Sequence, residues 1–399
     1  MSAGGDTTDD AGRTTPNRVI LLLVVVGLAG ALGLGFVGFS PNRILTATSV
    51  SLWQAASPPF LAAIVVAFVL LVVGAFGRGG REATLAALAG AILLLFADLT
   101  ATGAAATAIL HGATSPAARV SLGGGFWVLL VVAFLATAEA LQRLNVGPAL
   151  RVLLGLAIVA GLALLASAHA FDDLSIVHEW ANRRDEYAQA FGEHIRLVLS
   201  ALALSVAIGV PLGLAATQSA ARSGRIFTVL SLVQTIPSIA LFGLLIGPLT
   251  TLSEAVPGLR EIGVRGIGFT PALIALTLYG LLPIARNTET GVKGVPVAVI
   301  DAARGMGLTA LQVATRVSLP LALPTLLAGL RIVTVQLVGL TVVAALIGAG
   351  GFGRFVFLGL GQTATDLVLL GALSAIMLAL VADAALRLLT LAATRAFVA

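Results

Sequence analysis

The sequence predicts an all-α polytopic membrane protein with about ten transmembrane helices. Of its 399 residues, 58% are hydrophobic and 10% are charged, and the mean hydropathy is +1.06. Soluble domains usually contain about a quarter charged residues. The apolar residues also gather in runs of bilayer length, with arginines at the ends of the runs. This placement explains the net charge of +5 by membrane topology, so we expect no nucleic-acid partner.

The first part of the chain predicts a short tail and five spans. Residues 1–17 are rich in Thr, Asp and Gly, and we expect a disordered cytoplasmic tail there. The run Val19–Phe39 is too long for the apolar region of a signal peptide and lacks a clear cleavage site, so it predicts a retained first span. The other spans of this N-terminal extension, residues 18–170, are expected at Phe60–Phe76, Ala83–Ala104, Gly124–Leu141 and Val152–Ala168.

The second part predicts an acidic extracytoplasmic loop, residues 171–193, and a core over residues 194–392. Five spans are expected in this core, at Ile195–Ala215, Ile226–Ile246, Pro271–Pro283, Leu321–Ile347 and Leu367–Leu389. Basic residues mark alternate connections between spans, and the positive-inside rule then places both termini in the cytoplasm. The basic residues assigned to the inner side are Arg13, Arg18, Arg78, Arg81, Arg143, Arg151, Arg222, Arg225, Arg286, Lys293, Arg304, Arg316, Arg387 and Arg395.

Residues 294–324 form a less apolar segment between two strongly apolar ones. Asp301, Arg304 and Arg316 would each cost about 2.5 to 3.5 kcal/mol at a bilayer centre, whereas about nine Val, Ile and Leu residues return about 0.3 to 0.6 kcal/mol each. The segment therefore stays outside the membrane, on the cytoplasmic side.

Within this segment we expect two short helices joined by a glycine elbow. Gly305 and Gly307 can adopt positive φ, which would end the first helix and turn the chain. Thr309 and Gln312 have the spacing of a capping box, so a second helix should begin there and stop before Pro320.

The pattern of this segment resembles the EAA loop of ABC importer permeases. That loop reads Glu-Ala-Ala, three residues, Gly, nine residues, Ile, one residue and Leu-Pro, and here Asp replaces Glu and Val replaces Ile. The matching residues are Asp301, Ala302, Ala303, Gly307, Val317, Leu319 and Pro320. The resemblance implies a type I importer core with the MetI-like fold, whose cytoplasmic coupling loop, residues 286–320, docks on a partner ATPase. The alternative is an ordinary amphipathic linker.

Four further stretches are similar to permeases of glycine betaine, choline and related osmoprotectant importers. They are HIRLVLSALALSVAIGVPLG from His194, QTIPSIALFGLLIGPL from Gln234, LTLYGLLPIARNTETGV from Leu276 and ALIGAGGFGRFVFLGL from Ala345. The similarity covers residues 191–389. Some members of that group resemble this chain in having an N-terminal transmembrane extension.

Two polar tracks within apolar spans are candidates for a translocation pathway. Polar side chains inside a span need partners, and proline frees a backbone carbonyl, so each track favours a kinked polar region. The alternative is that Gln234 and Ser238 only hydrogen-bond a neighbouring helix. By the resemblance, the pathway would be lined by Gln234, Thr235, Pro237 and Ser238 on one span and by Tyr279, Pro283, Asn287 and Thr288 on the next.

Three other features of the sequence are candidate sites. The sequence GAGGFG, residues 348–353, lacks the Lys-Ser/Thr of a phosphate-binding loop and predicts a bent or re-entrant gate segment on the outer side. Asp98 lies within a span, yet its place near the outer end favours a satisfied or snorkelling structural role. The acidic loop with His169 and His178 fits no ligand spacing, so no metal site is expected.

The chain offers no catalytic chemistry of its own. It contains no cysteine and no GxxxxGKS/T motif, so we expect ATP and Mg²⁺ to be bound by the partner ATPase. Its Trp and Tyr residues are too scattered to form an aromatic cage, so a small-molecule solute would be selected by a separate extracytoplasmic binding protein. Because family ATPases work as pairs, the single coupling loop implies a second permease copy or a paralogue.

The resemblance thus implies the permease subunit of an ATP-driven ABC importer for glycine betaine or a related osmoprotectant in the cytoplasmic membrane. One alternative is an ABC permease for another small polar solute, such as an amino acid or another quaternary amine. A second is an ion-coupled secondary transporter, which would predict inverted repeats and acidic residues at the midplane. The predicted spans show no evident repeat.

Overall fold

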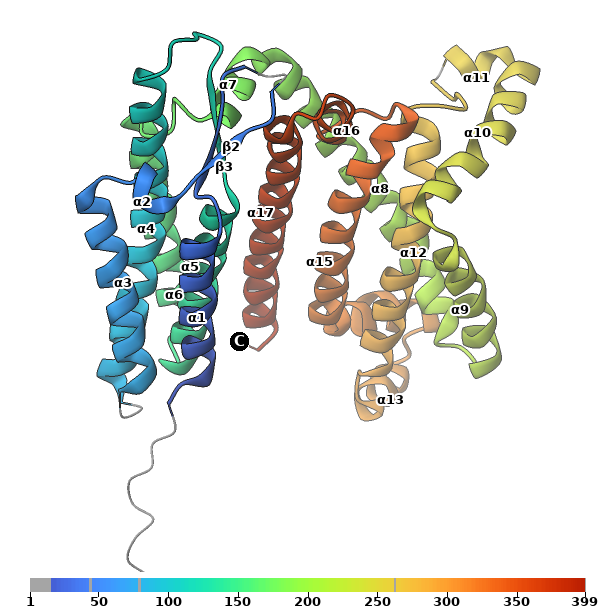
Figure 1. Ribbon diagram of the computed structural model, residues 1–399. Helices are drawn as coiled ribbons and strands as arrows, with labels where there is room; N and C mark the ends of the chain where they lie inside the picture. The colour runs from blue at the N-terminus through green and yellow to red at the C-terminus, as the bar shows by residue number, and fades with distance from the viewer. Residues whose placement is uncertain (1–15, 43–44, 78–79, 262, 399) are drawn as a thin grey trace, which may run out of the picture. The chain divides into compact units, whose positions relative to one another are not determined.

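The computed structural model describes residues 16–42, 45–77, 80–261 and 263–398 (Figure 1). Most of the predicted tail, including Arg13, lies outside the described residues, as do Arg78 and the side chain of Arg395. The chain divides into two compact units, Met1–Ala181 and Asn182–Ala399, called here the N-terminal unit and the C-terminal unit.

The N-terminal unit is a helical bundle with a small sheet. Helices α1, α3, α4 and α5 contact one another, and their shared core includes the fully buried Leu71, Leu94 and Leu129. Helix α6 differs, because none of the residues 149–167 is buried. The elements are α1 (Arg18–Gly33), β1 (Val37–Ser40), β2 (Thr48–Val50), α2 (Leu52–Ala55), α3 (Pro58–Phe76), α4 (Arg81–His111), β3 (Arg119–Leu122), α5 (Gly124–Arg143), α6 (Pro148–Ser167) and α7 (Ser175–Asn182), the last of which runs into the C-terminal unit.

The small sheet is a feature that the sequence analysis does not predict. Its strand order is β2-β1-β3, both pairs are antiparallel, and β1 and β3 contact α4. The predicted span Val19–Phe39 is therefore wrong at its end, because α1 stops at Gly33 and the chain enters β1. The Phe36 N–H donates to the Val50 carbonyl at 2.8 Å, so pairing with β2 replaces the helical hydrogen bond at this point.

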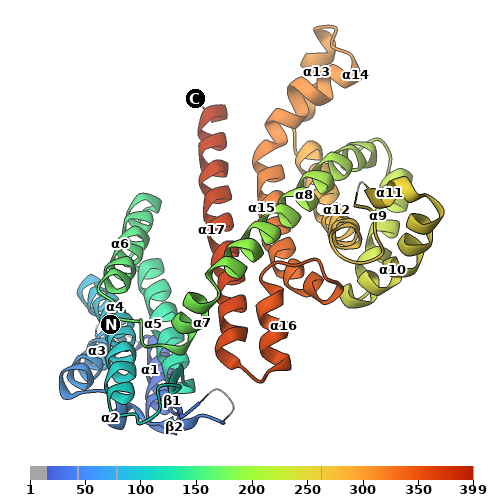
Figure 2. The same cartoon turned by 90° about the horizontal axis from the view of Figure 1, so that it is seen from above.

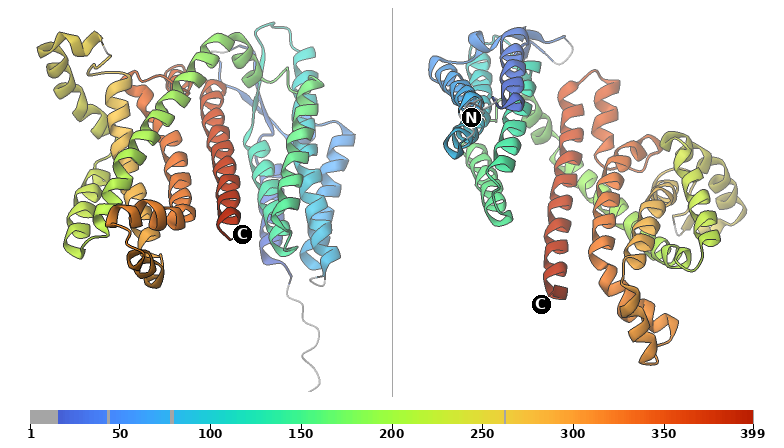
Figure 3. Two further views of the ribbon diagram at one scale, coloured as in Figure 1. Left: turned by 180° about the vertical axis from the view of Figure 1, so that it is seen from behind. Right: turned by 90° about the horizontal axis from the view of Figure 1, so that it is seen from below.

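The C-terminal unit is a helical bundle with a short projecting segment. The views from behind and from below show this segment, α13 and α14, extending away from the other helices of this unit (Figure 3). The elements are α8 (Arg184–Ala216), α9 (Ala220–Thr235), α10 (Ser238–Ala255), α11 (Pro257–Glu261), α12 (Phe269–Lys293), α13 (Val297–Gly305), α14 (Ala310–Val313), the π-helical η1 (Ala314–Ser318), α15 (Leu319–Ala344), the 3-10 helix η2 (Ala345–Ile347), α16 (Gly353–Gly361) and α17 (Thr365–Val398).

Helix α12 is the central helix of the C-terminal unit. It contacts α8, α9, α10 and α15. Its contacts with α8 and α15 are very close: a Cβ added to Gly213 of α8 would lie 2.5 Å from the Ala285 carbonyl oxygen, and one added to Gly329 of α15 would lie 2.6 Å from the Asn287 Cβ. Small residues allow such close packing, which is how helices associate in a membrane.

The predicted span Ile226–Ile246 is wrong as a single helix. Helix α9 ends at Thr235 and α10 begins at Ser238, with Ile236 and Pro237 in extended conformations between them. Proline has no N–H to continue a helix and disfavours helical geometry in the residue before it, which accounts for the break. By contrast, α12 continues well past Pro283, to Lys293.

The all-α membrane class is confirmed, with a different set of spans. Among the described residues, nine helices are long and apolar enough to cross a membrane, against about ten predicted. Helix α1 has 16 residues and falls short of that length. Of the two helices that replace the span Ile226–Ile246, α10 meets the length and hydropathy criteria.

Substitution of Gly213 tests whether close packing against α12 stabilises the C-terminal unit. Gly213→Ala should lower the thermal unfolding midpoint in detergent, because the added methyl group meets α12 and such overpacking costs about 1 to 3 kcal/mol.

The matched control is Gly243→Ala in α10, where an added Cβ meets nothing within 4 Å. This variant should unfold at the same temperature or slightly higher, because alanine favours a helix over glycine by about 0.5 to 1 kcal/mol. Equal midpoints for the two variants would contradict the packing argument.

Candidate functional site

The predicted cytoplasmic segment contains two short helical pieces joined at Gly307. We call residues 297–318, which comprise α13, α14 and η1, the knob. Gly307 has a φ of 85°, so the predicted left-handed elbow is present there, whereas Gly305 is helical and the elbow role predicted for it is wrong. The predicted capping box is also present, with Thr309 N–H donating to Gln312 Oε1 at 2.8 Å and Gln312 N–H donating to Thr309 Oγ1 at 3.4 Å.

The second helical piece does not stop before Pro320, so that prediction is wrong. It continues through the π turn of η1 into α15, and Pro320 lies in the first turn of α15. The Leu319 N–H donates to the Ala314 carbonyl, five residues back. Proline is tolerated in a first helical turn, and the wider π turn before it lets the chain remain helical. The knob is therefore joined to α15 without a loop.

The knob presents an exposed surface with several large apolar side chains. Val297, Met306 and Leu311 are 71%, 74% and 73% exposed. Figure 2 shows α13 and α14 standing clear of the other helices of the C-terminal unit. Of the residues in the predicted motif, Asp301, Ala302 and Gly307 are exposed, Ala303 is buried, and Val317, Leu319 and Pro320 are half-buried.

The break between α9 and α10 is hydrogen-bonded to α12. Pro283 lacks an N–H, so the carbonyl of Tyr279, one turn earlier in α12, has no proline N–H to accept from. The Gln234 side chain supplies a donor to that carbonyl, with Nε2 at 3.0 Å. The Tyr279 hydroxyl in turn donates to the carbonyl of Ile236, next to Pro237. Gln234 thus bonds a neighbouring helix, as the alternative reading of this track predicts.

The other residues of the two predicted tracks are placed differently from one another. Thr235 and Pro237 are exposed, whereas Ser238 is the half-buried first residue of α10. The Asn287 side chain donates to the Pro283 carbonyl at 2.8 Å. Thr288 is fully buried, and its hydroxyl donates to the Ile284 carbonyl at 2.8 Å within α12. The structure therefore brings Gln234, Tyr279 and Pro237 together and places Thr288 in the interface with α8.

An open groove runs along α9 and reaches Arg286 of α12. Hydroxyl groups line much of it, and Thr235 is the one residue of the predicted tracks that it includes. The guanidinium carbon of Arg286 lies 3.7 Å from the centre of the Phe227 ring. The lining residues are Ser223, Gly224, Phe227, Thr228, Ser231, Leu232, Thr235 and Arg286.

Next to this groove lies a charged cluster that the sequence analysis misses. Glu289 of α12 is 5% exposed, and its carboxylate accepts from Ser223 Oγ of α9 at 2.7 Å and from Lys293 Nζ at 2.7 Å. Arg286 also lies 3.5 Å from the same carboxylate. The spacing of Glu289 and Lys293, four residues apart on a helix, predicts their ion pair. Nothing in the sequence pairs Glu289 with Ser223.

The glycine segment near residue 350 is bent, as predicted. Gly348, Gly350 and Gly351 all have positive φ. The Gly351 N–H donates to Glu193 Oε2 at 3.0 Å, and the Phe352 N–H donates to His194 Nδ1 at 3.3 Å. These bonds fix the bend against the beginning of α8. Its predicted role as a gate stays a prediction.

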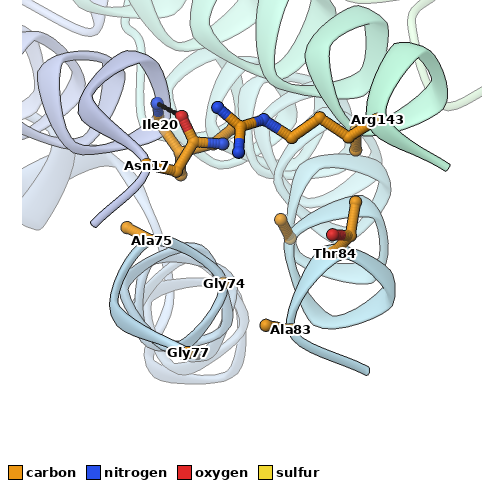
Figure 4. A pocket seen from close by; sticks show the side chains of 10 residues that line it. Asn17, Ile20, Gly74, Ala75, Gly77, Ala83, Thr84 and Arg143 are labelled. Atoms are coloured by element: carbon orange, nitrogen blue, oxygen red, sulfur yellow. Dashed lines mark hydrogen bonds between the residues drawn. The ribbon is translucent and has the colours of Figure 1, made fainter. Parts of the chain in front are cut away.

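The N-terminal unit has a small polar pocket at the start of α1 (Figure 4). Asn17 caps α1 by accepting from the Val19 and Ile20 N–H groups, and its amide donates to Glu139 Oε1 at 3.4 Å. Arg143 donates to the same oxygen at 2.5 Å. The pocket residues are Asn17, Ile20, Gly74, Ala75, Gly77, Ala83, Thr84, Ala87, Ala140 and Arg143. These contacts join α1 to α5, and we assign the pocket a structural role.

Asp98 of α4 is fully buried, so the predicted snorkelling or satisfied role is wrong. Neither oxygen of its carboxyl group has a hydrogen-bond partner among the described residues. The nearby Thr102 hydroxyl instead donates to the backbone carbonyl of Asp98 at 2.7 Å. Asp98 lies on the buried face of α4, where its side chain cannot reach water.

The described residues contain no group of three or more His, Asp or Glu side chains arranged to hold a metal ion. At the start of the predicted outer loop, His169 contacts Asp172, with Nδ1 2.6 Å from Oδ2, and both side chains are exposed.

Comparisons with known proteins match the two halves of the chain separately. Residues 209–394 match the family described as binding-protein-dependent transport system inner membrane component. Residues 16–177 match the family described as the N-terminal domain of the ABC transporter permease YehY.

Individual relatives match the second half. The chain is 35% identical over 192 residues to the glycine betaine/carnitine/choline transport system permease protein OpuCB of Bacillus subtilis, which covers 48% of this chain and 81% of that protein. It is 39% identical over 194 residues to the carnitine transport permease protein OpuCB of Listeria monocytogenes, covering 49% and 82%. It is 37% identical over 210 residues to the osmoprotectant import permease protein OsmW of Salmonella typhimurium, covering 53% and 93%.

Among solved structures, the chain is similar to one of the inward-facing MetNI methionine ABC transporter. The TM-score is 0.46 at 25% identity, and the match covers 53% of this chain and 98% of the solved chain.

Removal of the Asp98 carboxyl group tests its lack of partners. Asp98→Ala should raise the thermal unfolding midpoint in detergent, because a buried polar group without a partner costs about 1 to 3 kcal/mol.

Leu94→Ala is the matched comparison, because Leu94 is also fully buried and lies one turn away on the same face of α4. This variant should unfold at a lower temperature, at a cost of about 2 to 5 kcal/mol. A comparable loss for Asp98→Ala would mean that the carboxyl group has a stabilising partner.

Proposed function

The chain belongs to the binding-protein-dependent transport system inner membrane component family, and from this membership we propose that it moves glycine betaine or a related osmoprotectant across the cytoplasmic membrane. Members of the family are transport components, and ATP hydrolysis belongs to a separate partner protein. The relatives named for glycine betaine, carnitine, choline and osmoprotectants support this substrate class. The proposed mechanism rests on the exposure of the knob.

The knob is the proposed docking element for the ATPase. It lies outside the apolar spans, and Val297, Met306 and Leu311 give it an apolar surface that a protein partner would cover. This exposed surface includes Asp301, Ala302 and Gly307. The less exposed residues of the motif would hold the knob in shape and join it to α15; they are Ala303, Val317, Leu319 and Pro320. Nucleotide-driven movement of the ATPase would then tilt the knob and the helices attached to it.

The groove along α9 is the proposed inner part of the translocation pathway. Its hydroxyl groups suit a small polar solute, and Thr235 lies in it. The break between α9 and α10 follows this groove along the chain, and the residues that form it or bond to it are Gln234, Pro237, Ser238 and Tyr279. Pro283 and Asn287 would line the adjoining face of α12, and Thr288 would contribute by packing α12 against α8.

The complete importer would contain further components. ATP and Mg²⁺ would be bound by the ATPase, and an extracytoplasmic binding protein would capture the solute. A second copy of this chain or a paralogous permease would supply the second knob that a pair of ATPases requires. Both termini and the knob would face the cytoplasm.

Transport by reconstituted complexes tests this function and the role of Gly307. With its ATPase and binding protein, the unmutated chain should accumulate labelled glycine betaine in proteoliposomes only when ATP is supplied. Gly307→Leu should abolish solute-stimulated ATP hydrolysis, because a side chain at φ 85° costs about 1 to 2 kcal/mol and changes the docking surface. Gly307→Ala should have a milder effect.

The control is Gly361→Ala, which lies outside the knob and where an added Cβ meets nothing within 4 Å. This variant should hydrolyse ATP at nearly the normal rate. Normal coupling in Gly307→Leu complexes would exclude the knob as the transmission element. ATP-dependent uptake of an amino acid, with none of glycine betaine, would replace the proposed substrate.

Labelling of single cysteines tests the proposed orientation, since the chain has none of its own. Ala302→Cys in the knob should be protected from an impermeant thiol reagent in sealed cells and should react after the cells are opened. Ala255→Cys, at the end of α10, should react in sealed cells. Both positions are exposed, so access to the side chain does not limit the reaction. Reaction of Ala302→Cys in sealed cells would reverse the topology.

A further inference from the structure

Glu289 occupies an unusual position at the knob end of α12. Its carboxylate is almost fully buried, yet it contacts two basic groups and one hydroxyl group. Lys293 and Arg286 belong to the same helix, and Ser223 belongs to α9. The 2.7 Å bond from Ser223 Oγ to Glu289 Oε1 is therefore the part of the cluster that joins two helices.

A second contact joins the same two helices one turn away. Arg286, which approaches the Glu289 carboxylate on one side, stacks its guanidinium group over the ring of Phe227 of α9 at 3.7 Å. Ser223 and Phe227 are four residues apart and so lie on the same face of α9. The paired contacts hold this face against the last two turns of α12.

These contacts lie between the knob and the groove. Helix α12 ends at Lys293, and only three residues separate it from α13, so a displacement of the knob would act on the turn that contains Glu289 and Lys293. On the other side, Ser223 and Phe227 line the groove, and α9 leads from them to Thr235 and the break before α10. We propose that Glu289 is a positioning residue that transmits movement of the knob to α9 and thereby sets the opening of the groove.

The chemistry of the cluster suits such a role. Buried ion pairs contribute little net stability, because desolvation offsets their attraction, but loss of one partner leaves a buried charge underpaired. A hydrogen bond from a hydroxyl group to a carboxylate is shorter and stronger than one between neutral groups. The Ser223–Glu289 bond therefore favours one placement of α9 relative to α12 and resists sliding between them.

The test measures coupling in reconstituted complexes and rests on the function proposed above. The readout is the amount of glycine betaine accumulated per ATP hydrolysed. Ser223→Ala and Glu289→Gln should each lower this ratio about three- to tenfold, as expected for the loss or weakening of one hydrogen bond. Ser223→Thr keeps the hydroxyl group and should restore the ratio.

The double variant Ser223→Ala/Glu289→Gln distinguishes transmission from independent structural effects. If the two residues act through one contact, the double variant should couple no worse than the more affected single variant. The ATPase should remain bound in all of these variants, because none of them changes the knob. Thr251→Ala, which removes a hydroxyl bonded within α10 at 3.2 Å, should couple normally.

Three outcomes would overturn the inference: unchanged coupling in Ser223→Ala, failure of Ser223→Thr to restore it, or losses that add in the double variant. The unmutated complex is measured in the same assay. If the unmutated complex shows no ATP-dependent uptake, the proposed function is wrong, and this inference falls with it. If the unmutated complex transports normally and the variants keep the same ratio of uptake to ATP hydrolysis, only this inference is wrong.

Discussion

The close packing of α12 between α8 and α15 is the constraint on which the rest of the C-terminal unit depends. In hydrocarbon there is no hydrophobic effect to draw helices together, so contact rests on small residues and on hydrogen bonds between helices. Gly213 and Gly329 supply the small residues. Within α12 the Tyr279 carbonyl cannot accept from Pro283, which lacks an N–H, and it accepts from the Gln234 side chain at the α9–α10 break instead. Together with the bond from the Tyr279 hydroxyl to the Ile236 carbonyl, this contact holds the break that Pro237 imposes against α12.

Features that depend on neighbouring residues in the chain could be predicted from the sequence. The left-handed turn at Gly307 and the capping box of Thr309 and Gln312 each involve residues at most three positions apart, and both are present. The helix break at Pro237 was predicted only in part, because the sequence favours a kink there but not two separate helices. The apolar run continues across it, so average hydropathy showed one span where the proline imposed two helices. At Pro320 a proline was interpreted as a stop, but the preceding π turn keeps the chain helical.

Contacts between distant residues account for most of what sequence reasoning could not reach. Ser223 and Glu289 are 66 positions apart, and neither lies in a motif that would connect them. The burial of Asp98 depends on how α4 is rotated within its bundle, and a helix that is apolar on nearly every face gives little indication of that rotation. The small sheet of the N-terminal unit is similar, because its strands are three or four residues long and β3 comes from far along the chain.

The bonds at the beginning of α8 have a consequence for the order of biosynthesis. Glu193 and His194 each bond a residue 158 positions later, and the Tyr187 hydroxyl lies 2.9 Å from Ser374 Oγ, 187 positions later. The ribosome therefore releases α8 into the membrane well before its partners in the glycine segment and α17 exist. During that interval His194, which is fully buried in the finished protein, must be accommodated by water, lipid headgroups or the insertion machinery. The end of the C-terminal unit that contains Tyr187, Glu193 and His194 therefore cannot be completed until α17 has been synthesised.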